Sequence, residues 1–498
     1  MKQPNILFLM TDQQRIDHVS YHPDARIETP NMARLADSVG FVNAQTVNPI
    51  CTPARCALMT GKYTHQIGML AMSGDLSLQH PTYPQALQRA GYHTSGVGKF
   101  HLLQTWRWGA GRGNGLDLLG LKPRMKQYGF DYLWETAGKQ LSRQNYCDYC
   151  RYLDERGLLE RYLDFVDAAG GNSNDARSDL DEGDGAPSPV EYKDYVDVVT
   201  ADVIIDRIKR RPSDRPFFIF GSFLSPHKPM DPPIEYLEAV EYEEVDDFIL
   251  GDESLPDDAK KRLWKKRRAY KAMVHLLDDQ VGRILDTLDS EGILDETVVL
   301  FTSDHGEMMG DHARLQKQSY YRQSVTVPMA IRHPDHLDGR VIDTPVEITD
   351  ITATILDLAG LDPAEALSKP WPAFHDRVPC RSLMPIVRGE TDRVRDFSFS
   401  ECNGQWQMVQ DAEWKYVRHL AYDRPGAVLE ELYHLADDPN ELVNLAPAPA
   451  EAASRAAALR AYREFVMDTT PPAQTRWAPL PPDGEAHSYP AAQLGRPS

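Results

Sequence analysis

The chain has 498 residues, of which 42% are hydrophobic and 26% charged, so it can bury a large core. Its 74 acidic and 54 basic side chains give a formal net charge of -20, which disfavours nucleic acid and anionic membrane surfaces as partners. It has no apolar run of membrane-spanning length, no leader with a cleavage site and no regular cysteine spacing, so we expect a cytoplasmic protein without a disulfide framework.

Short apolar runs followed at once by polar side chains are the first predicted elements. They are residues 6–10 before Thr11 and Asp12, residues 217–220 before Ser225-Pro226-His227, and residues 298–301 before Ser303, Asp304 and His305. Buried parallel strands have this continuous apolar character and present functional groups at their carboxyl ends. Between and after them, two amphipathic helices are marked by Tyr270, Val274, Leu277, Val281, Ile284 and Leu288, and by Ile348, Ile351, Ile355 and Leu358 before Gly360. The pattern predicts an α/β fold with a mostly parallel sheet covered on both faces.

The end of the chain has a different composition. Between Phe397 and Leu445, aromatic-rich segments such as residues 406–409 and 414–417 predict short antiparallel strands. We therefore expect a catalytic domain over residues 1–390, a smaller antiparallel subdomain over 391–468, and an extended proline-rich tail over 469–498. The tail is either a disordered end or an arm that docks on a neighbouring subunit, which leaves a homo-oligomer open.

The segment from Cys51 to Gly61 carries the most specific motif. It reads CTPARCALMTG, with the pattern C-x-P-x-R-x-x-L-x-T-G. This resembles the signature of the formylglycine-dependent sulfatases of the alkaline-phosphatase-like superfamily, and every fixed position is filled. In that family a formylglycine-generating enzyme oxidises the cysteine, so the resemblance implies that Cys51 is the precursor of an aldehyde hydrate. The alternative, a cysteine packed as a small apolar side chain, does not account for a complete motif.

An aldehyde hydrate suits the hydrolysis of a sulfate ester because it supplies both a nucleophile and a way to release the product. One hydroxyl attacks sulfur and expels the alcohol, which gives a covalent sulfated enzyme. The second hydroxyl then loses its proton, and the hemiacetal collapses and ejects sulfate without water attacking sulfur.

Two pairs of polar residues at strand ends resemble the metal ligands of these sulfatases. They are Asp12 with Gln13, and Asp304 with His305, which the resemblance places around one divalent ion together with a formylglycine oxygen at position 51. Oxygen-rich ligation puts Ca²⁺ first, while the imidazole leaves Mn²⁺, Mg²⁺ and Zn²⁺ as alternatives. Gln13 stands where the family more often has a second aspartate, which removes one negative charge. The alternative to metal binding, for either aspartate taken alone, is that its side chain forms an Asx-turn at the end of the strand.

Further basic residues match other parts of the family pattern. The segment GKFH resembles a G-K-W-H motif and implies that Lys99 binds sulfate and that His101 deprotonates the second hydroxyl of the hydrate. His227 resembles the histidine at the leaving-group oxygen, and Lys317 the lysine that contacts both sulfate and leaving group. Arg55, from the signature itself, is implied to hold the formylglycine hydroxyl and to balance charge.

A segment near the end of the chain extends the resemblance to the predicted subdomain. Residues 432–445, LYHLADDPNELVNL, resemble the family's L-Y-D-L…D-P-x-E…N-L segment. The resemblance thus runs from residue 5 to about 446 and implies the alkaline-phosphatase-like α/β sandwich with a smaller C-terminal antiparallel sheet.

Two rival functions remain at this point. One is a phosphonate or phosphate ester hydrolase of the same superfamily, which is disfavoured because Lys99 and His101 look sulfatase-like. The other is a non-catalytic anion-binding protein in which Cys51 stays unmodified.

The alcohol part of the substrate is the least defined feature. We expect a sulfated carbohydrate, as a small molecule or an oligosaccharide, ahead of aryl or small alkyl sulfates. Five aromatic side chains between residues 102 and 195 either stack on a sugar or aryl ring or belong to the core: Trp106, Trp108, Tyr128, Tyr132 and Trp134.

Overall fold

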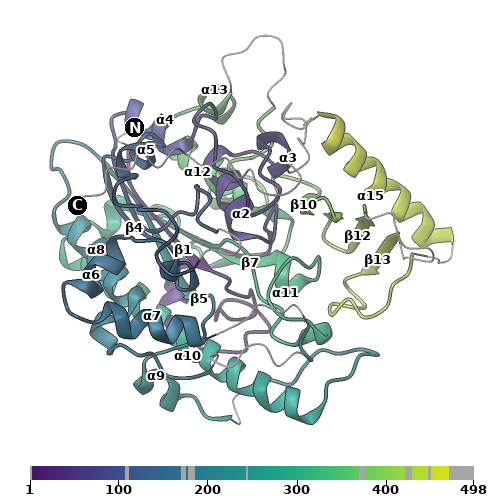
Figure 1. Ribbon diagram of the computed structural model, residues 1–498. Coiled ribbons are helices and arrows are strands. Elements are labelled where there is room, and N and C mark those ends of the chain that lie inside the picture. Colours follow the sequence, from purple (N-terminus) through teal and green to yellow (C-terminus); the bar gives the residue numbers. More distant parts are fainter. Residues whose placement is uncertain are drawn as a thin grey trace, which may run out of the picture.

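The computed structural model describes residues 3–106, 111–169, 175–177, 185–242, 245–368, 377–420, 429–446 and 450–469. Within these ranges, nine strands form one large sheet and four form a second, smaller sheet (Figure 1). Trp108 and the predicted tail beyond Thr469 lie outside the described residues.

The large sheet has the strand order β4-β3-β5-β1-β6-β7-β2-β8, with β9 also paired to β2. Its strands are β1 (Asn5–Asp12), β2 (Val39–Gln45), β3 (His93–Lys99), β4 (Tyr132–Thr136), β5 (Phe217–Pro226), β6 (Thr297–Ser303), β7 (Thr326–Arg332), β8 (Arg340–Ile342) and β9 (Val346–Glu347). All neighbouring strands pair in parallel except β7, which is antiparallel to both β6 and β2. The prediction of a mostly parallel sheet is confirmed.

The central sheet is buried on both faces, and the side chains of β1 alternate between two cores. Ile6, Phe8 and Met10 belong to one apolar cluster, whereas Leu7 and Leu9 belong to the other. Because successive side chains of a strand point to opposite faces, a strand with a helical layer on each side needs a continuous apolar run. This is the physical reason why the run at residues 6–10 predicted a buried strand correctly.

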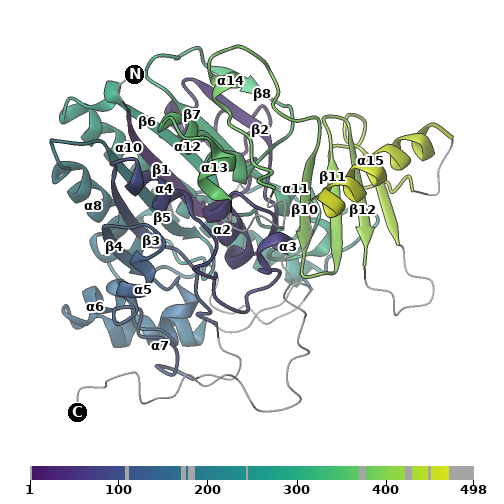
Figure 2. The ribbon, with the colours of Figure 1, turned by 90° about the horizontal axis from the view of Figure 1, so that it is seen from above.

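Helices cover the two faces of the sheet (Figure 2). One face packs against α2 (Cys51–Thr60), α4 (Tyr83–Arg89) and α12 (Ile348–Leu358), and the other against α8 (Val196–Lys209) and α10 (Asp257–Ser290). The predicted helices marked by Tyr270 to Leu288 and by Ile348 to Leu358 are the second half of α10 and the whole of α12. Shorter helices complete this part: α1 (Pro30–Leu35), α3 (Thr64–Ile67), α5 (Lys122–Lys126), α6 (Asp148–Asp154), α7 (Leu159–Ala168), α9 (Ile234–Ala239), α11 (Arg322–Val325), α13 (Pro363–Leu367) and α14 (Met384–Val387).

The second sheet is antiparallel and lies at the side of the molecule (Figures 1 and 2). Its strands follow one another as β10 (Ser398–Cys402), β11 (Trp406–Gln410), β12 (Trp414–His419) and β13 (Glu430–His434), and α15 (Ala450–Thr469) packs on β11 and β12. Val409, Tyr416 and Leu432 of the sheet share an apolar cluster with Leu459 of α15. The two aromatic-rich segments are therefore antiparallel strands as predicted, while the domain boundaries at 390 and 468 stay predictions.

A buried ion-pair network at Arg395 connects the start of the second sheet to the first. Its guanidinium lies 3.0 Å from a carboxylate oxygen of Glu347 and donates from Nε to Asp350 at 3.0 Å. Glu347 also accepts from the main-chain N–H of Phe399 in β10 at 2.9 Å. Arg395 thus neutralises two carboxylates that lie away from water at the junction.

Replacing Arg395 with methionine is expected to cost about 3–5 kcal/mol of stability, because two buried carboxylates lose their countercharge. Arg393→Met is the matched control: Arg393 pairs with Asp396 at 3.3 Å and is 68% exposed, so its loss should cost less than about 1 kcal/mol. Thermal and urea denaturation of both variants measures the difference. Equal stability losses would contradict the structural role of the buried network.

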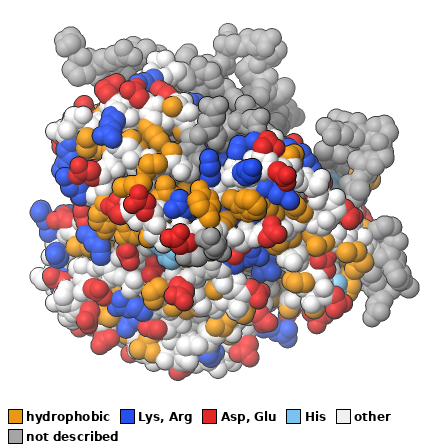
Figure 3. Space-filling view, turned by 90° about the horizontal axis from the view of Figure 1, so that it is seen from below, with side chains coloured by type: hydrophobic (Ala, Val, Ile, Leu, Met, Phe, Trp, Pro, Cys, Tyr) orange, Lys and Arg blue, Asp and Glu red, His pale blue; other side chains and the backbone are white. Residues whose placement is uncertain are grey.

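The surface shows no dominant charge on the face that Figure 3 displays, where acidic and basic side chains are interspersed. Among the helices of the described residues, none has the length and apolar character needed to cross a membrane. The cytoplasmic location stays a prediction from the sequence.

Candidate active site

Four adjacent parallel strands bring the predicted polar residues to one edge of the sheet. These strands are neighbours in the order β3-β5-β1-β6. Strand β3 ends at Lys99 and β1 at Asp12, while β5 ends just before His227 and β6 just before Asp304. Because parallel strands share a direction, their carboxyl ends meet at the same edge. Residues more than 200 positions apart in the chain therefore become neighbours.

Cys51 lies at the first position of α2, above this edge. The preceding residue, Ile50, is extended, and the left-handed Gly61 (φ 65°) ends the helix. Pro53 is tolerated in the first turn because the N–H that it lacks would have no partner within the helix. The helix start also favours negative charge at its first residues, and Cys51 is only 1% exposed.

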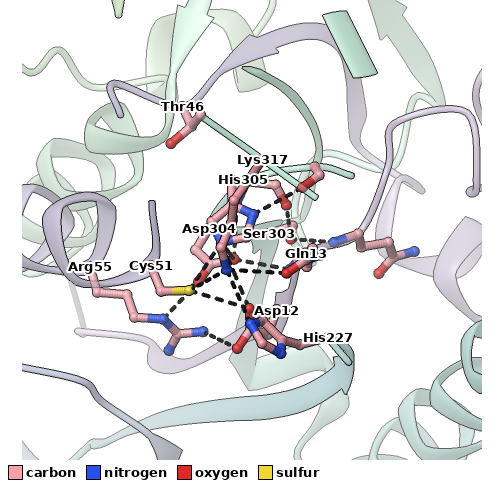
Figure 4. A network of polar contacts seen from close by, with 12 residues as sticks. Asp12, Gln13, Thr46, Cys51, Arg55, His227, Ser303, Asp304, His305 and Lys317 are labelled. Carbon is pink, nitrogen blue, oxygen red and sulfur yellow. Dashed lines mark hydrogen bonds and ion pairs between the residues drawn. The ribbon is translucent and has the colours of Figure 1, made fainter. Parts of the chain in front are cut away.

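Asp12, Cys51, Asp304 and His305 form a buried cluster whose potential ligand atoms all lie within 4.8 Å of one another (Figure 4). The Sγ of Cys51 lies 3.2 Å from Nε2 of His305 and 3.9 Å from Oδ1 of Asp12. Nδ1 of His305 lies 3.0 Å from the carbonyl of Gly306, which directs Nε2 into the cluster. Residue 51 is a cysteine here, and its Sγ marks the place that a formylglycine oxygen would take.

Gln13 borders the same cluster through its main chain and its side chain. Its main-chain N–H donates to Oδ1 of Asp304 at 3.0 Å, and its carbonyl accepts from the Tyr270 hydroxyl at 2.7 Å. Its side-chain amide donates from Nε2 to Glu307 and accepts at Oε1 from Lys317 at 3.1 Å. The residue has a left-handed conformation (φ 71°), which turns the chain sharply after β1.

The ammonium of Lys317 lies among three of the five residues for which a metal-binding role was predicted. Its Nζ is 2.8 Å from Sγ of Cys51, 3.1 Å from Oε1 of Gln13 and 3.2 Å from Nε2 of His305. These donor atoms therefore converge on a position that suits a positive charge. Two carboxylates, an amide oxygen and an imidazole nitrogen also form a donor set that fits one divalent cation.

Arg55 links the end of β3, the middle of β5 and the residue after β6 beneath the cluster. Its guanidinium donates to Oδ2 of Asp304 at 2.8 Å, to the carbonyl of Lys99 at 2.6 Å and to the hydroxyl of Ser222 at 2.8 Å. Burial lowers the pKa of Arg55, but the neighbouring carboxylates raise it by more, with Asp304 ahead of Asp12. The net pKa of Arg55 therefore lies above its usual value. Arg55 is thus a permanent buried cation, while its implied contact with a formylglycine hydroxyl stays a prediction.

A glycine allows the close approach of β3 to β5 beside Lys99. Gly98 has a left-handed φ of 104°, and a Cβ at this position would lie 1.8 Å from the carbonyl oxygen of Ser222. Only a residue without a side chain fits this contact. The conformation places the ammonium of Lys99 against Oδ2 of Asp12, with which it forms a buried ion pair.

The surrounding cations favour negative charge on the residues at the centre. Burial raises the pKa of the Cys51 thiol, but Lys317, Lys99 and His305 lower it more, so the net pKa lies well below its ordinary value. Burial also raises the pKa of Asp12, but Lys99, His227 and Arg55 together bring it below its usual range. Burial lowers the pKa of Lys317, but the negative charges of Cys51, Asp12 and Asp304 together raise it above its usual value. The site is therefore built to hold an anionic group at position 51.

Two further histidines border Cys51 and are neutral near pH 7. Burial lowers the pKa of His101 to about 4, although the imidazole hydrogen-bonds to Cys51. Burial and the nearby Lys317 lower the pKa of His227, whose Nε2 lies 3.1 Å from the Lys317 ammonium. Both rings are thus able to accept a proton at neutral pH.

The structure brings together every residue that was predicted for the site, and it adds two that the sequence analysis did not assign. Ser222 accepts from Arg55, and Glu307 accepts from Gln13. Glu307 follows the Asp304-His305 pair closely, so its place in that segment was an available signal. Ser222 lies within β5 and has no sequence signal.

The aromatic residues considered for substrate stacking are mostly structural. Tyr128 and Trp134 are buried in the two cores of the sheet. Tyr132 packs beside Trp134 with the Arg207 guanidinium 4.2 Å from the centre of its ring, and Trp106 is partly buried beside Arg143. The structure thus supports the core alternative for Tyr128 and Trp134, whereas Tyr132 and Trp106 are only partly buried against the core.

The family of the chain follows from comparison with known proteins. The model of the family described as Sulfatase matches residues 4–361, which include the whole Cys51 motif, Lys99, His227 and Lys317. The chain belongs to the sulfatase family. It is therefore a sulfuric ester hydrolase of the alkaline-phosphatase-like superfamily.

Relatives of this sulfatase cover almost the whole chain. The arylsulfatase of Clostridium perfringens is 28% identical over 472 residues, which are 89% of this chain and 90% of that protein. The phosphonate monoester hydrolase of Agrobacterium radiobacter superposes with a TM-score of 0.72 at 24% identity, covering 94% of this chain and 96% of that one. A structure in complex with D-glucosamine-2-N,6-O-disulfate superposes with a TM-score of 0.65 at 20% identity, covering 94% and 98%. The two structures establish the shared fold, including the separate antiparallel sheet.

Proposed function

We propose that this sulfatase hydrolyses a sulfate monoester of a carbohydrate through formylglycine made from Cys51 and a covalent sulfated enzyme. The observation that carries the proposal is the position of Cys51 at the start of α2, in contact with Lys317 at 2.8 Å and His305 at 3.2 Å inside a buried cationic site. A formylglycine-generating enzyme supplies the modification during maturation.

In the first step, the hydrate at position 51 attacks the sulfate ester. One hydroxyl oxygen forms a bond to sulfur while the bond between sulfur and the alcohol oxygen breaks. The leaving alcohol takes a proton from the Lys317 ammonium, or from His227 after Lys317 has protonated it across the 3.1 Å between their nitrogen atoms. The proton that the attacking hydroxyl loses returns to Lys317, whose Nζ lies 2.8 Å from Sγ of Cys51. Such general acid catalysis contributes about 10²–10⁴-fold to the rate.

In the second step, the enzyme releases sulfate without attack of water on sulfur. The second hydroxyl of residue 51 gives its proton to His101, the carbonyl re-forms, and the bond between carbon and the sulfated oxygen breaks. Water then adds to the aldehyde and restores the hydrate. His101 is suited to this role because its low pKa leaves the imidazole neutral and its ring contacts residue 51.

Positive charge stabilises the sulfate during both steps. Lys99 and Lys317 bind and orient the sulfate oxygens, and Arg55 keeps the strand ends in place through Asp304. Asp12, Gln13, Asp304, His305 and residue 51 would hold one divalent cation, with Ca²⁺ first and Mn²⁺, Mg²⁺ or Zn²⁺ as alternatives, which would add positive charge against the sulfate.

A phosphonate or phosphate ester hydrolase is the second candidate, because the Agrobacterium enzyme shares the fold. The discriminating feature is the pair Lys99 and His101, which places a cation and a base beside residue 51. We expect kcat/KM for nitrophenyl sulfate to exceed that for a nitrophenyl phosphonate ester by at least about tenfold in one enzyme preparation. Faster cleavage of the phosphonate would replace the proposed function by the second candidate.

Carbohydrate sulfates are proposed as substrates because the fold is shared with a protein solved in complex with a disulfated glucosamine. A panel of sulfated mono- and oligosaccharides, assayed beside choline sulfate and nitrophenyl sulfate, tests this class. At least one sulfated sugar should be turned over with a higher kcat/KM than the two small esters. If both small esters are better substrates than every sugar, the carbohydrate assignment is wrong although the sulfatase activity stands.

A non-catalytic protein would keep Cys51 unmodified. Conversion of the thiol to the aldehyde lowers the mass of the peptide that contains residue 51 by about 18 Da. Peptide mass spectrometry and an activity assay on the same preparation therefore distinguish the two states. Full activity with an unmodified thiol would contradict the proposed nucleophile.

A further inference from the structure

Glu307 lies directly behind Gln13, on the side away from Cys51. Its side chain is 1% exposed, and its carboxylate accepts three N–H groups. Oε2 accepts from the side-chain amide of Gln13, while Oε1 accepts from the main-chain N–H groups of Met309 at 3.1 Å and Gln316 at 2.5 Å. A carboxylate only accepts hydrogen bonds, and within the described part of the chain its partners are these three neutral N–H donors.

The two partners of the Gln13 side chain fix the direction of its amide. The carboxylate of Glu307 accepts a hydrogen bond, so it requires the NH₂ group on its side. The ammonium of Lys317 donates, so it requires Oε1 on the other side, where the two atoms are 3.1 Å apart. The flipped amide would place oxygen against a carboxylate and NH₂ against an ammonium. Both contacts therefore turn Oε1 toward the cluster of Cys51 and His305.

This arrangement gives a neutral residue the orientation that a ligand needs. Asp12 and Asp304 already place two carboxylates in the buried cluster. A carboxylate at position 13 would lie against a third acidic group, Glu307, with no cation between them, which is unfavourable for buried charges. The glutamine instead donates to Glu307 and turns its oxygen toward the cluster, where that oxygen already faces the positive charge of Lys317.

We propose that Glu307 is a positioning residue that makes Gln13 a metal ligand by holding the amide nitrogen. The inference rests on the metal site of the proposed function. Groups that orient metal ligands typically contribute about 10- to 100-fold to metal affinity.

The test exchanges the two side chains. In Glu307→Gln, the new amide oxygen accepts from Met309 and Gln316, so its NH₂ group faces Gln13 and competes with the NH₂ group there. We expect the Ca²⁺ dissociation constant to rise at least about tenfold. In the double variant Gln13→Glu/Glu307→Gln, the NH₂ group at 307 donates to the carboxylate at 13, and affinity should return to within about threefold of the original protein or exceed it.

Isothermal titration of full-length, chelator-treated protein with Ca²⁺, and separately with Mn²⁺, measures these affinities without an activity assay. Asp311→Asn is the matched control: it removes a buried charge in the same segment, and the partners of that charge are Arg15 and Arg267 rather than Gln13. Its metal affinity should stay within about threefold. Thermal melting of each metal-free variant reports whether it is folded.

The outcomes separate this inference from the proposed function. Unchanged affinity in Glu307→Gln, or a folded double variant that binds no better than Glu307→Gln, overturns the positioning role. If Glu307→Gln does not fold, the double variant decides alone, because the exchange restores every hydrogen bond of both residues. If the original protein binds neither cation, the metal site of the proposed function fails instead.

Discussion

Replacing Cys51 with alanine is expected to lower kcat for a sulfate ester by about 10⁴-fold or more while leaving the fold intact. The variant removes the precursor of the nucleophile, so the remaining cations can bind the ester but cannot form the covalent intermediate. Alanine is compatible with the first position of α2, and the site is supported by strand ends that do not depend on the Cys51 side chain.

Cys56→Ala is the matched control for this prediction. Cys56 occupies a variable position of the motif on the same helix, and it packs in an apolar cluster, where burial raises the pKa of its thiol. This variant should keep kcat within about threefold and lose some stability, since it leaves a small cavity. Circular dichroism and thermal melting verify the fold of both variants. A Cys51→Ala enzyme with a tenth or more of the original kcat would contradict the nucleophile assignment.

The sequence predicted those parts of the fold in which the local pattern of residues depends directly on burial or on neighbouring positions in the chain. The run at 6–10 is apolar throughout because both faces of β1 are covered. The motif from Cys51 to Gly61 is local, since the nucleophile, the helix and its glycine stop lie within eleven consecutive residues. Local constraints of this kind leave a readable pattern without any knowledge of distant partners.

Contacts between distant segments left no such pattern. Strand β7 runs antiparallel to its neighbours β6 and β2. Its direction could not be predicted from its sequence. Arg55 reaches Ser222 across 167 positions, and Gln13 reaches Glu307 across 294. The partner of Gln13 also depends on the left-handed turn after β1, which a glutamine adopts only where the surrounding structure imposes it.

The aromatic side chains between residues 102 and 195 illustrate an ambiguity that sequence alone does not resolve. A tryptophan or tyrosine serves equally well for stacking on a sugar and for filling a core. Tyr128 and Trp134 fill the core because β4 and the segment before it are covered on both sides. The type of residue therefore did not decide its role, whereas burial did.

Removing divalent cations is expected to lower kcat/KM for a sulfate ester by about 10³-fold or more, and adding them back should restore it. Asp12 and Asp304 are two buried carboxylates, and the donor atoms of Gln13 and His305 face the same space. A bound cation would neutralise these two carboxylates and add to the positive charge of Lys99, Lys317 and Arg55 that faces the sulfate. Without it, Asp12 and Asp304 offset part of that positive charge and weaken the binding of an anionic ester.

The measurement pairs exhaustive chelation and dialysis with determination of protein-bound metal, followed by titration with Ca²⁺, Mn²⁺, Mg²⁺ and Zn²⁺. Oxygen-rich ligation favours recovery with Ca²⁺ at the lowest concentration, whereas preferred recovery with Mn²⁺ or Zn²⁺ would indicate that the imidazole of His305 dominates the choice. The Asp304→Asn variant is the informative comparison, because the asparagine oxygen still accepts from the Gln13 N–H while the ligand charge is removed and an NH₂ group replaces the acceptor of Arg55. It should need at least about tenfold more metal for half-maximal activity. Activity that survives complete metal removal would contradict the metal-binding roles of all four residues, Asp12, Gln13, Asp304 and His305, because the reaction would then proceed without the ion that they are proposed to hold.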